Sequence, residues 1–351
     1  MSAPPDIRQD SASLGTRIFC LYSILAVFNV GAWLWAIVVF RNQTFLLGTA
    51  LLAYSFGLRH ALDADHIAAI DNVTRKFMQE SRRPLSVGFF FALGHSTVVV
   101  AASLVVYFAT SAAERRIDAI KNFGGGVASS ISAFFLIGIA LVNVAILRNV
   151  WRAFQRAVKG ELPVKEATQP FLLASPGSRI LRPLFGLLSK PWHMYPIGVL
   201  FGLGFDTATE VALLGISAGA ADKGLSMTAL VIFPLLFTAA MILVDTTDGI
   251  VMLGAYQWAF INPVRKLYYN LVITFFSVLV AFLIGGIELT VLLKNQLNVN
   301  GGLWDIAAGL NENFGMLGIV IVAAFVLTWI GSVAFYQATN LDRRESARSS
   351  E

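Results

Sequence analysis

The side chains that could carry chemistry are acids and histidines placed inside apolar stretches of the sequence. The densest group lies in RHALDADHIAAID, and others lie in LGHSTVVV, GFDTATE and MILVDTTD. They are Arg59, His60, Asp63, Asp65, His66 and Asp71, then His95, then Asp206 and Glu210, then Asp245 and Asp248. Acids far outnumber the single arginine, and three of the chain's four histidines belong to the group. An interior that is anionic and carries imidazoles is suited to binding a cation.

The mixture of ligand types narrows the class of cation. Neutral imidazole combined with carboxylate is typical of sites for first-row divalent metals such as Ni²⁺, Co²⁺, Zn²⁺ and Fe²⁺, whereas carboxylate alone suits Mg²⁺ or Ca²⁺. Ligand softness does not separate these four transition metals. The single cysteine, Cys20, excludes a disulfide framework and a thiolate metal cage.

The elements that must position these residues are membrane helices. Of the 351 residues, 56% are hydrophobic and only 13% are charged, about half of the roughly 25% found in soluble domains. So few charges exclude a soluble enzyme, a disordered regulator and a nucleic-acid-binding domain. Eight apolar runs are long enough to cross a bilayer, at about 17–40, 45–70, 86–109, 124–147, 194–220, 226–256, 267–293 and 314–338. The sequence therefore predicts an all-α polytopic membrane protein with eight transmembrane helices.

The distribution of Lys and Arg predicts the orientation. With the N-terminus inside, 19 of the 26 basic residues fall in inner segments and 6 in outer segments, so both termini are expected in the cytoplasm. A basic linker with several prolines, residues 148–193, divides the chain into two four-helix halves, 1–147 and 194–351. Pro234 interrupts the sixth run and should kink or tilt that helix.

The spacing of the paired acids places each pair on one helix face. Asp206 and Glu210 are four residues apart, and Asp245 and Asp248 are three apart. Met241 lies one turn before Asp245 on the same face. We interpret these residues as supporting or transit positions for a metal ion.

The two histidines of the second run present two alternatives. On a straight helix His60 and His66 would lie about 9 Å apart along the axis, giving two stations on a path. A single shared site requires local unwinding of the helix. The density of aspartates favours unwinding, and transporters commonly have broken helices at their binding sites.

Other polar residues have structural interpretations beside the functional ones. His95 alone could equally be a packing residue, and Arg59 is interpreted as a counter-charge to Asp63 or to an acid on another helix. Glu288, near the outer end of the seventh run, is counted with the acids inside apolar runs, but it is shallow enough to be a solvated end instead. No His-Glu-x-x-His pattern is present, so an intramembrane metalloenzyme is not favoured, and the chain is interpreted as a non-enzyme without a resident cofactor.

Four motifs in order resemble the signatures of the nickel/cobalt transporter family (NiCoT). They are RHALDADHIAAIDN in the second run, LGHSTVV in the third, LGFDTATE in the fifth and VDTTD in the sixth. The length, the eight predicted helices and the basic central loop are also similar, so the resemblance covers essentially the whole chain, and it is strongest to bacterial high-affinity nickel permeases. In one departure, Ala240-Met241 stands where the family often has Gly-Met.

The resemblance implies uptake of Ni²⁺, and also of Co²⁺, across the bacterial cytoplasmic (inner) membrane. It implies metal recognition by the His-x4-Asp-His motif of His60, Asp65 and His66, with His95 and the acids Asp63, Asp206, Glu210, Asp245 and Asp248 in support. The partners expected are a divalent transition-metal ion and the lipid bilayer, and the sequence does not identify a soluble acceptor for the metal. An efflux permease, or a carrier of another first-row metal such as Zn²⁺, is the alternative.

Overall fold

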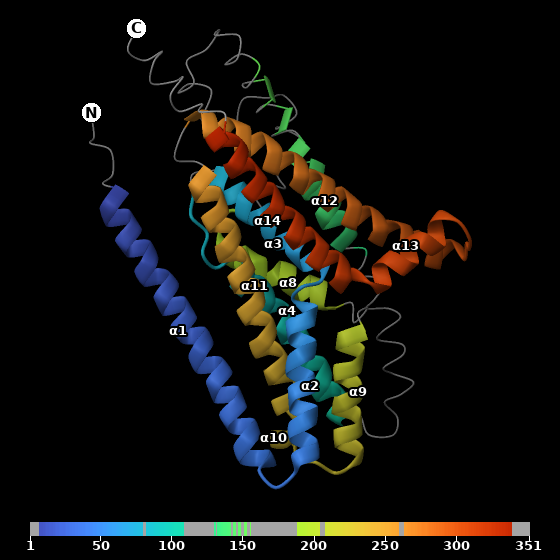
Figure 1. Ribbon diagram of the computed structural model, residues 1–351. Helices are drawn as coiled ribbons and strands as arrows, with labels where there is room; N and C mark the ends of the chain where they lie inside the picture. Colours follow the sequence, from blue (N-terminus) through green and yellow to red (C-terminus); the bar gives the residue numbers. More distant parts are fainter. Residues whose placement is uncertain are drawn as a thin grey trace.

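The protein is all-helical throughout the part of the chain that the computed structural model describes (Figure 1). The described residues are 7–79, 82–108, 188–203, 208–259 and 263–338, with 130, 132–141, 143–144, 147–148, 151–152 and 155. Most of the predicted linker, from 156 to 187, lies outside them.

Four long helices are apolar enough to cross a membrane by themselves. They are α1 (Ile7–Phe40), α4 (Val87–Phe108), α11 (Ile232–Ala259) and α12 (Pro263–Leu297). In α11 the candidate span begins with the short helix α10 (Met227–Leu230). The helix is interrupted at Val231, between α10 and α11. Pro234 lies in the first turn of α11, where its missing N–H removes no hydrogen bond within that helix.

Two further candidate spans are bent pairs of helices. α2 (Thr44–His60) and α3 (Ala64–Gln79) meet at 51°, and α13 (Leu303–Glu312) and α14 (Phe314–Ala338) meet at 80°. The described residues therefore hold four candidate spans, or six if each bent pair is one span. The predicted fourth run appears as a shorter apolar helix at Ser132–Leu141, and the fifth is divided between α8 (Met194–Gly202) and α9 (Ala208–Asp222), after the 3₁₀ turn η2 (Pro191–His193).

Helices from both halves of the chain pack together around the bend between α2 and α3. α11 lies against α2, α3 and α4, while α4 also packs against α8 and α9. Glycines permit the closest approaches: a Cβ on Gly88 would lie 1.9 Å from the backbone oxygen of Asp245, and one on Gly57 would lie 2.2 Å from that of Phe237. These contacts hold α11 close to both α2 and α4, and so bring Asp245 beside the motif of the second run.

Candidate metal site

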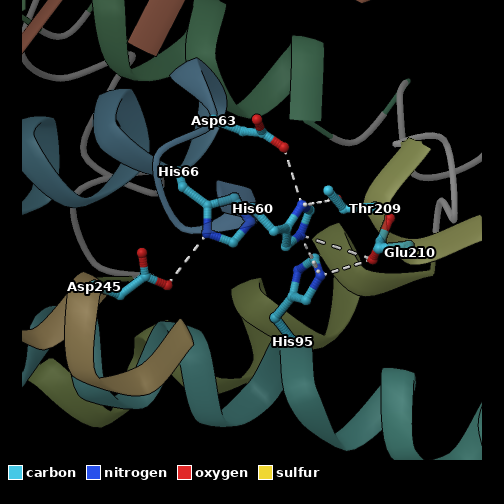
Figure 2. A network of polar contacts seen from close by, with 7 residues as sticks. All are labelled: His60, Asp63, His66, His95, Thr209, Glu210 and Asp245. Atoms are coloured by element: carbon cyan, nitrogen blue, oxygen red, sulfur yellow. Dashed lines mark hydrogen bonds and ion pairs between the residues drawn. The ribbon is translucent and has the colours of Figure 1, made fainter. Parts of the chain in front are cut away.

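Three histidines from three helices converge in the interior (Figure 2). The ring centroids of His60 and His66 are 4.6 Å apart, those of His60 and His95 are 4.8 Å apart, and those of His66 and His95 are 4.9 Å apart. One ring nitrogen from each forms a set whose members all lie within 4.8 Å of one another. All three side chains are buried. His95 therefore lies with the other two, as the functional interpretation of this residue required.

The break between α2 and α3 brings the first two rings together. His60 is the last residue of α2 and His66 is the third residue of α3. Between them the backbone tightens into turns, because the Leu62 amide bonds to the Arg59 carbonyl and the Asp63 amide bonds to the His60 carbonyl. Of the two arrangements that the sequence left open, the structure has the locally unwound one, with both rings in one cluster.

An acid contacts each histidine. Asp63 Oδ2 accepts a hydrogen bond from His60 Nδ1 at 3.0 Å, and Asp245 Oδ2 accepts one from His66 Nδ1 at 3.2 Å (Figure 2). A carboxylate on one ring nitrogen fixes the tautomer and leaves the lone pair of the other nitrogen for a metal. His66 Nε2 is buried and has no hydrogen-bond partner among the described residues, as expected of a nitrogen prepared for a ligand.

Glu210 lies beside the other two rings. Its Oε1 is 2.9 Å from His95 Nε2 and 3.8 Å from His60 Nε2, and the two Nε2 atoms are 3.0 Å from each other. Because His60 donates its Nδ1–H to Asp63, its Nε2 is an acceptor, and His95 Nε2 is the donor in the contact between the two rings. His95 would present Nε2 to a metal in its other tautomer, with the proton on Nδ1. Metal–nitrogen bonds are about 2 Å long, so small ring movements would close the set around one ion.

Some of the residues predicted to accompany the histidines line a cavity beside the three-histidine set. Asp65 is not in the three-histidine set. It lines a neighbouring cavity of about 310 Å³. Arg59 and Asp63 line the same cavity, which fits Arg59 as a counter-charge to this acidic wall. Thr209, which the sequence reasoning missed, lines it too, and its Oγ1 lies 3.4 Å from His60 Nδ1. Thr209 is adjacent to Glu210 in the fifth-run motif, the one signal that could have identified it.

Of the two interpretations of Glu288, the solvated end was wrong. Glu288 is only 6% exposed, it accepts a hydrogen bond from Ser132 Oγ at 2.9 Å, and it lines the cavity beside Asp65. Packing of α12 against the helix at Ser132–Leu141 excludes solvent from a position that hydropathy alone placed near a membrane surface.

The remaining predicted positions lie on α11 or outside the described residues. Asp245 also has a second oxygen, Oδ1, and Asp248 has an oxygen, Oδ2, that are buried without a hydrogen-bond partner in the described part of the chain. Met241 is fully buried in the apolar core shared by α1, α2, α4 and α11. Asp206 lies outside the described residues.

Residues 46–335 match the family model described as high-affinity nickel-transport protein. The chain belongs to this family. Membership of a transport family agrees with the prediction that the chain is not an enzyme, and the resemblance seen in the four motifs is confirmed over most of the sequence.

Individual relatives are similar along nearly their whole length. The chain is 50% identical to a high-affinity nickel transport protein of Cupriavidus necator, covering 94% of each chain. It is 47% identical to the hydrogenase nickel incorporation protein HupN of Bradyrhizobium diazoefficiens, covering 90% of this chain and 83% of the relative. It is 40% identical to the cobalt transport protein NhlF of Rhodococcus rhodochrous, covering 83% of each. No solved structure matches the chain.

Proposed function

We propose that the protein takes up Ni²⁺, and Co²⁺ as a second substrate, across the cytoplasmic membrane. The observation that carries this proposal is the buried set of His60, His66 and His95, with an acid on each ring, at a break in a membrane helix. Imidazole is a preferred ligand of Ni²⁺ and Co²⁺. The family match and the nickel and cobalt transporters among the relatives support these metals over Zn²⁺ and uptake over efflux.

We assign the residues to successive parts of the path. The cavity lined by Asp65, Glu288 and Arg59 receives the hydrated ion, since acids dominate its charged lining. Asp63 and Thr209 line this cavity and also contact His60, so they connect it to the metal set. His60, His66 and His95 then replace part of the water shell.

The acids of the later motifs carry the ion onward in this proposal. Asp245 contacts His66 through Oδ2, and its Oδ1 is buried without a hydrogen-bond partner in the described part of the chain. Asp248 lies three residues, about one helical turn, farther along α11. Asp206, from the same motif as Glu210, is assigned to this transit group from its spacing. Met241 lies on α11 one turn before Asp245, buried in the apolar core, and is assigned a supporting role there.

The proposed topology has eight spans and cytoplasmic termini, with the protein in the inner membrane of a bacterium. The six spans given by the long helices and bent pairs become eight when the helix at Ser132–Leu141 and the α8–α9 pair each belong to one. The 19 basic residues of the inner segments, concentrated in the linker 148–193 between the halves 1–147 and 194–351, support this orientation. A membrane potential of 100 mV, negative inside, would then favour entry of a dication by about 4.6 kcal/mol.

Accumulation of ⁶³Ni in cells that express single variants tests the assigned site. His60→Ala and His66→Ala should abolish high-affinity uptake at unchanged protein level in the membrane. His193→Ala is the matched control, because His193 lies in η2 and accepts a hydrogen bond from the Ser189 amide outside the cluster. Undiminished uptake by both cluster variants would defeat the assignment. Expression of the wild type should raise nickel sensitivity, whereas an efflux permease would lower it.

A further inference from the structure

We infer that α14, near the end of the chain, holds the broken segment of the metal site in place, and that Gly318 and Gly315 are its positioning residues. This inference rests on the proposed function, because it concerns how His60 and His66 are kept in one cluster. No motif of the site includes either glycine. α14 closely approaches the backbone and side chains of the break between α2 and α3.

Gly318 lies against the carbonyl group of Leu62. A Cβ added to Gly318 would be 1.7 Å from the Leu62 oxygen, 2.9 Å from the Leu62 carbonyl carbon and 3.1 Å from Ile67 Cδ1. Leu62 lies between the two histidines, in the segment that separates α2 from α3. Because the group in contact is backbone, no change of side-chain rotamer makes room. Any residue larger than glycine must push the segment and α14 apart.

Gly315 lies one turn earlier on the same helix, against the acid that orients His60. A Cβ on Gly315 would be 3.1 Å from Asp63 Oδ1 and 3.4 Å from Arg59 Nε. Asp63 uses its other oxygen to accept the hydrogen bond from His60 Nδ1. The absence of a side chain at Gly315 therefore leaves room for the Asp63 carboxylate in the position that orients the His60 ring. The contact is tight but involves side chains, so it can relax by a few tenths of an ångström.

A broken helix needs such outside support. At the break the Leu62 and Asp63 amides bond only three residues back, to the carbonyls of Arg59 and His60, so the regular helical ladder is interrupted there and the conformation depends on what packs against it. Metal and ligand-binding constellations must be held within about 0.5 Å of their productive geometry. Relief of the 1.7 Å approach at Gly318 requires a displacement larger than this tolerance. The structure therefore assigns to α14 an influence on metal affinity that acts through the segment between α2 and α3. None of the described residues of α14 is in the metal set.

A graded series of alanine substitutions on α14 tests the inference. Gly318→Ala should raise KM for ⁶³Ni uptake at least about tenfold, the lower range for loss of a group that orients a metal ligand. Gly315→Ala should raise KM by less. Gly331→Ala is the matched control, since a Cβ there meets nothing within 4 Å, and its KM should equal that of the wild type. Vmax per membrane-inserted protein should change less than KM in both test variants.

The visible absorption of Co²⁺ added to the purified full-length proteins is the second readout. It reports ligand geometry directly, so it should change in Gly318→Ala and stay constant in Gly331→Ala. A merely structural role would lower the amount of protein and leave both KM and the Co²⁺ spectrum unchanged. If Gly318→Ala does not reach the membrane, the KM and the Co²⁺ spectrum of Gly315→Ala alone test whether α14 positions the site.

The result that would overturn the inference is a wild-type KM and a wild-type Co²⁺ spectrum in each α14 variant that folds. That result leaves the proposed function standing, provided that the wild type transports nickel and His66→Ala does not. Absence of nickel uptake by the wild type would instead defeat the proposed function itself. The two failures are therefore distinguishable within one set of strains.

Discussion

Asp245→Asn tests the part that the acids play around the histidines. Asp245 is fully buried, and its Oδ2 accepts a hydrogen bond from His66 Nδ1 at 3.2 Å. The substitution preserves the shape of the side chain and removes its charge. It also lets the amide group turn its NH₂ toward His66, which would favour the wrong tautomer and place the proton on Nε2.

The expected loss of metal affinity follows from the role of a carboxylate that orients a metal-binding histidine. Replacing the group that orients a metal-bound histidine costs 10- to 100-fold in metal affinity, or about 1.4–2.7 kcal/mol. Asparagine still has an oxygen that accepts a hydrogen bond, so we expect a KM increase near tenfold for Asp245→Asn and near 100-fold for Asp245→Ala. Both should be measured as initial rates of ⁶³Ni uptake, normalised to protein in the membrane.

Asp305→Asn is the control for this pair. Asp305 is exposed and forms an ion pair with Lys294 at 2.7 Å. Neither residue is assigned to the metal path. Neutralisation of Asp305 should leave KM unchanged. If Asp245→Asn also keeps the wild-type KM while its protein level is normal, the proposed function of Asp245 as an orienting partner of His66 is wrong.

Three further outcomes are expected. Glu210→Gln should weaken nickel uptake more than Thr209→Val in the same assay, because Glu210 Oε1 lies near both His95 and His60, whereas Thr209 Oγ1 lies 3.4 Å from one ring nitrogen. Ni²⁺ at 100 times its Kd should stabilise the purified protein by about 2.7 kcal/mol, seen as a higher melting temperature that His66→Ala loses. The affinity for nickel should fall as the pH drops below about 6, since protonated imidazole cannot bind a metal; uptake kinetics that stay constant from pH 7.5 to 5.5 would contradict this.

The sequence predicted the helices and the residues of the site better than their arrangement. Ionisable residues in apolar runs identified His60, His66 and His95, because such side chains are costly in a membrane without a function. Spacing alone left a shared site and two stations as alternatives. At the break that decides between them, α14 lies against the Leu62 carbonyl, a tertiary contact that a local pattern does not reveal.

Tertiary contacts account for the other differences. Its position in the seventh run left Glu288 open to being a solvated end, yet the helix at Ser132–Leu141 buries it. Gly318 is one of 29 glycines, and nothing in its neighbours marks it; only the approach to the Leu62 carbonyl shows that glycine is required there. Asp65 belongs to the same motif as His66, but on α3 it points to the cavity and not to the histidine set.

X-ray absorption at the nickel edge, recorded on the purified protein with one bound Ni²⁺, shows whether His60, His66 and His95 bind the metal. The proposed site predicts nitrogen ligands with the scattering pattern of two or three imidazole rings, reduced by one ring in His95→Ala. A nickel ion surrounded by oxygen atoms alone, with no imidazole contribution in the wild type, would contradict the assignment of His60, His66 and His95 as the metal site.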